Sequence, residues 1–121
     1  MRIYGHNYVA YVTARGELDS VGRVIDFSVL KEQVGGWIDR NWDHGMILNS
    51  ADKGVIDLMV SVTTENGTVQ KLYLMDANPT AENMARHLLE DVGPQVLGGT
   101  GVELCEVTLW ETENCYATAR L

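Results

Sequence analysis

The chain has little of several features that mark particular protein classes. Its 121 residues include two cysteines and two prolines, with no CxxC pair and no Cys/His cluster at zinc-finger spacing. This argues against a structural zinc module. No apolar run reaches the roughly 20 residues of a membrane span, and no secretory signal or transit peptide is recognisable. These absences predict a cytoplasmic protein without a membrane partner.

Basic residues are also scarce, because 9 Lys and Arg stand against 17 Asp and Glu, for a formal net charge of −8. Binding to phosphate backbones or anionic lipids depends on a basic surface, so nucleic acid is not an expected partner. A chain of this length can bury about two thirds of its unfolded surface without metal or disulfides. We therefore expect a single domain over residues 1–121.

The first half of the chain contains one strand pattern and one helix pattern. Residues 7–14 carry apolar or small side chains on both strand faces, which predicts a strand covered on both sides. Asp26 is a natural N-cap for a helix from Phe27 to Arg40. The adjacent glycines Gly35 and Gly36 cost about 1 kcal/mol each in a helix, so we expect a bend or a close backbone neighbour there.

The second half begins with an ambiguous segment. Residues 55–64 are rich in β-branched side chains, Glu65-Asn66-Gly67 is a turn signal, and residues 69–75 alternate, which predicts a hairpin. The spacing of Ile56, Met59 and Val60 also suits a short helix. Asn78 as N-cap with Pro79 in the first turn predicts a helix ending near Gly93-Pro94. Strands are expected at residues 102–110 and 115–121.

Glu111 is the strongest candidate for a binding residue. Counting by twos from Cys105 passes Val107 and Leu109 before reaching Glu111, which places a carboxylate at the end of an apolar strand face. Such a carboxylate needs a partner, and a planar ligand with two parallel N–H groups supplies one. The alternative is a structural salt bridge to Arg120 or Arg86.

Other titratable residues have weaker claims. Asp43-His44 could support proton transfer, but this dipeptide after a helix is also a common capping turn. His6, in Tyr4-Gly5-His6, could hold a metal or a substrate oxygen, or be a hydrogen-bonded structural residue. His87 falls on the polar side of its helix and is expected to be solvated. Cys105 and Cys115 are expected to be small buried hydrophobes.

Five segments together resemble the family of 6-pyruvoyl-tetrahydropterin synthase and 6-carboxy-tetrahydropterin synthase. They extend from residue 4 nearly to the C-terminus in the order and approximate spacing of that family. The segments are Tyr-Gly-His-Asn-Tyr at 4–8, Gly-Arg-Val-Ile-Asp-Phe at 22–27 with Leu30-Lys31, Trp-Asp-His at 42–44 with Leu48-Asn49, Asn-Pro-Thr-Ala-Glu-Asn at 78–83, and Trp-Glu-Thr at 110–112. Residues 51–76 look longer than in the shortest members.

The resemblance implies an α+β tunnelling fold, in which an antiparallel sheet with two helices on one face assembles into oligomeric barrels. A homohexamer of two stacked trimers would place the active sites between subunits. Glu111 would anchor a pterin ring, Thr80 and Glu82 would line the pocket, and Asp43 and His44 would belong to a proton relay. In the family, zinc on three histidines polarises the substrate while a cysteine acts as base.

The chain departs from this pattern at the metal. The family's paired ligands are His-Gly-His, whereas Tyr4 occupies the first position here, and His6 is the only remaining zinc-ligand position. A phenol with a pKa near 10 replaces imidazole poorly on zinc. We therefore expect a homologue that keeps a pterin-like pocket but lacks zinc, the catalytic cysteine and standard synthase activity. The alternative is an active carbon–oxygen lyase acting on 7,8-dihydroneopterin triphosphate.

Overall fold

The computed structural model describes residues 8–18, 20–22, 25–43, 45–66, 71–112 and 115–121. The chain divides into two compact units, which are described separately. One contains residues 4–37 and 80–121 and is called the sheet–helix unit. The other contains residues 38–79, together with residues 1–3, and is called the crossover unit after its main connection.

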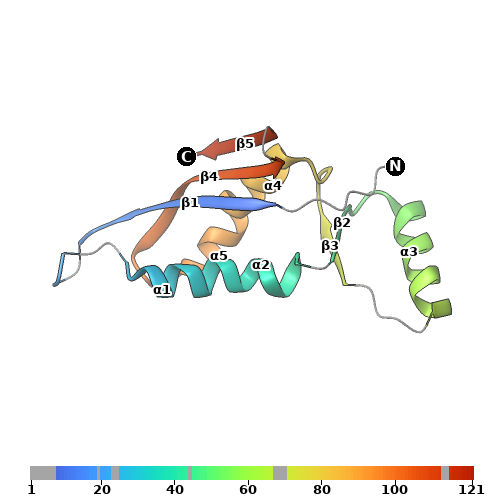
Figure 1. The fold of residues 1–121 in the computed structure, drawn as a ribbon, viewed down its shortest axis with the longest axis horizontal. Helices are drawn as coiled ribbons and strands as arrows, with labels where there is room; N and C mark the ends of the chain where they lie inside the picture. Colours follow the sequence, from blue (N-terminus) through green and yellow to red (C-terminus); the bar gives the residue numbers. More distant parts are fainter. Residues whose placement is uncertain (1–7, 19, 23–24, 44, 67–70, 113–114) are drawn as a thin grey trace. The chain divides into compact units, whose positions relative to one another are not determined.

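An antiparallel sheet with strand order β1-β4-β5 forms the sheet–helix unit (Figure 1). Its strands are β1 (Val9–Gly16), β4 (Val102–Thr112) and β5 (Cys115–Arg120). The side chains on one face of β4 and β5 are buried, namely Leu104, Val107, Leu109, Ala117 and Ala119. Within the chain, the opposite face of β1 is open, with Val9 50% and Tyr11 62% exposed. The expectation that this strand is covered on both faces is therefore wrong for the single chain.

The first helix begins after Asp26, whose Oδ1 accepts a hydrogen bond from the Ser28 amide at 2.9 Å. It runs through α1 (Phe27–Leu30), a π-helical turn η1 (Lys31–Gly35) and α2 (Gly36–Asn41), which confirms the predicted helix. The π-helical turn ends at the glycine pair, where the sequence predicted a distortion. Val34 and Trp37 are buried, but Phe27 is 85% exposed and so does not join the core.

The second helix starts later and ends later than predicted. Thr80, not Asn78, is the N-cap of α4 (Ala81–His87), which continues through η2 (Leu88–Val92) into α5 (Gly93–Leu97). Pro94 did not end the helix, because it lies in the first turn of α5, where a missing N–H is tolerated. The apolar face of this helix packs against β4 and β5 and consists of Ala81, Met84, Ala85, Leu88, Leu89 and Val92.

The crossover unit corrects the predicted hairpin. Strands β2 (Met46–Asn49) and β3 (Leu72–Met75) pair in parallel, with Met46 opposite Leu72 and Asn49 opposite Met75. Parallel neighbours need a crossover connection, and α3 (Lys53–Asn66) supplies it from the segment predicted as a strand and turn. The helical spacing of Ile56, Met59 and Val60 therefore outweighed the β-branched composition. Across the described ranges, no helix is long and apolar enough to cross a membrane.

Candidate functional site

Glu111 lies near the end of β4 and is half-buried. The pairing of β4 with β5 is irregular between Trp110 and Thr112, so Glu111 occupies a break in the ladder. Such breaks are frequent next to active sites, where they redirect a side chain. Strict alternation along β4 therefore does not by itself fix the face to which Glu111 belongs.

The arginines that could have neutralised Glu111 are bound elsewhere. Arg120 Nε is 2.9 Å from Glu106 Oε2, and Arg86 Nη1 is 2.7 Å from Glu90 Oε1. In the part of the chain that the structure describes, neither arginine pairs with Glu111. The salt-bridge alternative is therefore not realised among these residues, and the carboxylate is left to hydrogen bond with water or a ligand.

Thr80 and Glu82 lie at the start of α4, and both are exposed. Thr80 Oγ1 accepts a hydrogen bond from the Asn83 amide at 3.1 Å. Because this bond uses an oxygen lone pair, the hydroxyl hydrogen of Thr80 can still be donated. Glu82 lies in the first helical turn, where the helix dipole favours a negative charge.

The start of α4 faces the same end of the sheet as Glu111. A Cβ added to Gly93 would lie 3.1 Å from Leu104 Cδ1, so the later part of the helix contacts the beginning of β4. From Gly93 back to Ala81 the helix covers about 18 Å, and from Leu104 forward to Glu111 the strand covers about 23 Å. The helix and the strand therefore run in opposite directions, as Figure 1 shows.

Asp43 belongs to the crossover unit and follows α2. Its side chain is exposed, and its amide donates to the Ile38 carbonyl at 2.9 Å. This bond closes the helix terminus, as expected for a capping turn. The remaining predicted residues His44, His6 and Tyr4 lie outside the described residues, so the pairing of Asp43 with His44 stays a prediction.

The described ranges contain no group of three or more His, Cys, Asp or Glu side chains that could hold a metal ion. The described part of the chain therefore offers no donor set that fits a catalytic zinc, which needs three protein ligands. His6, the one family ligand position that keeps histidine, is not among these residues. The predicted loss of the zinc site accordingly continues to rest on the sequence.

Two expectations about reactive side chains were wrong. His87 is not solvated, because its side chain is only 18% exposed and its Nδ1 lies 2.8 Å from Asp91 Oδ2. The ring of Trp37 is its neighbour, with centroids 6.1 Å apart. Cys115 is exposed rather than buried, whereas Cys105 is half-buried. An i,i+4 His–Asp pair was visible in the sequence and would have predicted the His87 contact.

The structure brings together two asparagines, of which Asn78 was predicted to be a helix N-cap and Asn49 was given no structural role. Asn49 Nδ2 donates to Asn78 Oδ1 at 2.9 Å, although 29 positions separate the residues. Next to them, Ser50 Oγ donates to Asp76 Oδ1 at 3.1 Å. Both contacts join the ends of β2 and β3, and the parallel pairing that creates them was not predicted. No local signal could therefore have revealed them.

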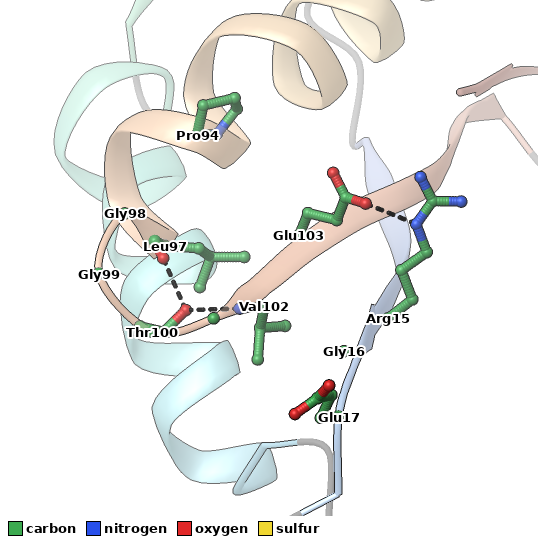
Figure 2. Close-up of a pocket in the computed structure, with 11 residues that line it drawn as sticks. Arg15, Gly16, Glu17, Pro94, Leu97, Gly98, Gly99, Thr100, Val102 and Glu103 are labelled. Atoms are coloured by element: carbon green, nitrogen blue, oxygen red, sulfur yellow. Dashed lines mark hydrogen bonds and ion pairs between the residues drawn. The ribbon is translucent and has the colours of Figure 1, made fainter.

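An open hollow of about 1060 Å³ lies at the other end of β4 from Glu111 (Figure 2). The end of β1, the glycine-rich loop 98–101 and the start of β4 surround it. Arg15 Nε is 2.6 Å from Glu103 Oε1 at its rim, and this hydrogen bond raises the pKa of Arg15. From Glu103 to Glu111, β4 spans about 27 Å, so this hollow is separate from the predicted pterin site.

Comparisons with known proteins show the family to which the chain is similar. The chain matches the family described as 6-pyruvoyl tetrahydropterin synthase over residues 1–121. It is 39% identical over 115 residues to 6-carboxy-5,6,7,8-tetrahydropterin synthase of Rickettsia felis, covering 94% of this chain and 80% of the relative. A putative enzyme of the same name from Pyrococcus horikoshii is 30% identical, with 96% and 73% covered.

Solved structures show the same fold at lower identity. An uncharacterised protein of Wolinella succinogenes superimposes with a TM-score of 0.73 at 20% identity, covering 95% of this chain and 77% of that protein. The 6-pyruvoyltetrahydropterin synthase of Plasmodium vivax gives 0.69 at 20% identity, covering 100% and 82%. The fold is thus the α+β tunnelling fold predicted from the sequence. The chain belongs to the 6-pyruvoyl tetrahydropterin synthase family.

Proposed function

We propose that the protein binds a pterin or a similar fused pyrimidinone through Glu111, with Thr80 and Glu82 lining the pocket. One observation carries the proposal: Glu111 is half-buried and makes no ion pair with Arg86 or Arg120 in the described chain. A pterin presents an amino group and a ring N–H side by side, which matches the two oxygens of a carboxylate. Thr80 adds a hydroxyl donor from the helix that runs beside β4.

The proposal further holds that zinc-dependent synthase turnover is absent. Tyr4 occupies the first position of the family's His-Gly-His pair, and a neutral phenol is a weak zinc ligand. Recognition of the pterin ring depends on Glu111, whereas turnover depends on zinc. Loss of turnover therefore need not abolish binding of the ring. Family membership supports a cytoplasmic homohexamer, and the open face of β1 supports burial against further copies.

A second candidate is an active pterin synthase, and the relatives favour it. Relatives from four Rickettsia species, at 36–39% identity over 94% of the chain, are named 6-carboxy-5,6,7,8-tetrahydropterin synthase. This candidate requires zinc held by an altered ligand set that includes His6. Asp43 and His44 would then act in proton transfer. Zinc content separates the two candidates directly.

Calorimetry with neopterin tests the binding site. Glu111→Gln turns one acceptor oxygen into a donor that faces the ligand's N–H, and we expect affinity to fall by about thirtyfold, equivalent to about 2 kcal/mol. Glu103→Gln is the matched control at the opposite end of β4 and should bind as wild type does. Equal affinity of Glu111→Gln and wild type would refute the pocket. His44→Ala should scarcely change binding.

Elemental analysis after gel filtration tests the absence of zinc, and the elution mass tests the hexamer. We expect no stoichiometric zinc and background elimination of triphosphate from dihydroneopterin triphosphate. One zinc per subunit that is lost in His6→Ala would establish the second candidate instead. A monodisperse monomer by light scattering at micromolar concentration would contradict the proposed assembly.

A further inference from the structure

Glu82 and Glu111 carry two negative charges at the same end of the sheet–helix unit. Glu82 is exposed in the first turn of α4, next to buried Ala81, and Glu111 lies near the end of β4, against which α4 packs. The helix and the strand run in opposite directions (Figure 1), so the beginning of α4 lies near the end of β4. Among the described side chains, neither carboxylate has an ion-pair partner. The proposed site therefore presents two uncompensated carboxylates.

The arginine that could neutralise Glu82 within its own helix is turned away from it. Arg86 lies four residues after Glu82 and four residues before Glu90, so either glutamate is within its reach on the helix surface. Its Nη1 is 2.7 Å from Glu90 Oε1, which directs its charge toward the later turns of the helix. Glu82 remains in the first turn, where its negative charge is favoured by the helix dipole. Its charge is therefore available to a ligand.

The other described cations of this unit are neutralised or lie elsewhere. Arg15 Nε is 2.6 Å from Glu103 Oε1, and Arg120 Nε is 2.9 Å from Glu106 Oε2. Lys31, the remaining described lysine or arginine of the unit, belongs to η1, which contacts α5 at the far end of the second helix from Glu82. The described charge around the proposed ligand is therefore negative.

We infer that Glu82 and Glu111 select pterins by the charge of the substituent on the ring, favouring a cationic or neutral substituent over an anionic one. This inference rests on the proposed function, in which Glu111 binds the ring and Glu82 lines the pocket. A protonated amine on the ring is attracted to both carboxylates, whereas a carboxylate or phosphate is repelled by them. Glu82 is thus a specificity-determining residue, and its charge discriminates among ligands that share one ring.

Two ligands with the same ring and opposite substituent charges test the inference, namely 6-aminomethylpterin and pterin-6-carboxylate. Calorimetry at low ionic strength should show that wild type binds the amine about tenfold more tightly than the carboxylate. In Glu82→Gln this ratio should fall to about threefold, because one of the two charges is removed. In Glu82→Lys it should fall to about one, because the new charge offsets that of Glu111. Added salt should reduce the wild-type ratio by screening.

Glu17→Gln is the matched control, because it removes the same charge beside the hollow at the opposite end of the unit and should keep the wild-type ratio. Equal affinity of wild type for the two charged ligands would overturn the inference, as would a ratio that Glu82→Gln leaves unchanged. Neopterin, whose substituent is uncharged, tests the proposed function separately. If wild type binds neopterin without discriminating between the charged ligands, the inference alone fails. If it binds none of the three, the proposed pterin site fails as well.

Discussion

The sheet–helix unit and the crossover unit are stabilised by different means. Among the side chains that the structure describes, nearly all the buried apolar ones belong to the sheet–helix unit, and Trp42 and Met75 belong to the crossover unit. In α3, by contrast, Leu58 is 48% and Val60 is 50% exposed. The first unit therefore depends on a packed core, and the second depends more on strand pairing and polar contacts such as Asn49–Asn78.

The proposed ligand contacts all belong to the sheet–helix unit. Glu111 and Thr80, the proposed ligand contacts, lie on a strand and a helix that pack against each other in the sheet–helix unit. Sites built on rigid elements hold their geometry better than sites on loops. Matched substitutions in the two units will show whether the sheet–helix unit depends more on core packing than the crossover unit does.

The largest expected effect is at Leu88, which is fully buried in the sheet–helix unit. Leu88→Ala leaves a cavity beneath the sheet, so we expect the free energy of unfolding to fall by about 2–5 kcal/mol. The same change at half-exposed Leu58 in α3 should cost less than about 1 kcal/mol. Urea titration of both variants provides the measurement. Equal losses of unfolding free energy in the two variants would show that Leu58 is as well packed as Leu88.

Glycine substitutions should have opposite signs at two positions of the sheet–helix unit. A Cβ on Gly93 would lie 3.1 Å from Leu104 Cδ1 and 3.3 Å from the Leu88 carbonyl oxygen. Gly93→Ala should therefore destabilise the fold by about 1–3 kcal/mol. At Gly35 the nearest atom is Lys31 Cγ at 3.9 Å, so Gly35→Ala should stabilise by up to about 1 kcal/mol. Thermal unfolding monitored by circular dichroism shows whether each variant is more or less stable than wild type.

His87 offers a smaller effect in the same unit. His87→Ala removes both the hydrogen bond to Asp91 and the contact with Trp37, for an expected loss of about 1–2 kcal/mol. His87→Phe keeps a ring beside Trp37 and should lose about half as much. Urea unfolding of the two variants separates these contributions. Wild-type stability of His87→Ala would mean that the residue is effectively solvated, as the sequence had suggested.

The sequence predicted the sheet–helix unit well because its signals are local and strong. Asp26 caps the first helix, and period-two alternation located β4. The N-cap at Thr80 was missed because Asn78-Pro79 offers an equally good local signal. The hairpin error arose where β-branched composition and helical spacing disagreed. The Asn49–Asn78 contact depends on parallel pairing across 29 residues, which no local pattern encodes.

The smallest expected effect tests the helix that the sequence left ambiguous. Ser61 is exposed within α3 (Lys53–Asn66), so substitutions there change intrinsic propensity rather than packing. In a helix, Ser61→Ala should stabilise by a few tenths of a kcal/mol, about 0.5 at most, and Ser61→Val should not. In a hairpin the order would reverse, because valine favours strands and alanine does not. Amide hydrogen exchange across α3 reports the local free energy of opening. Slower exchange in Ser61→Ala than in Ser61→Val would support the helix and the parallel crossover, and the opposite order would restore the hairpin.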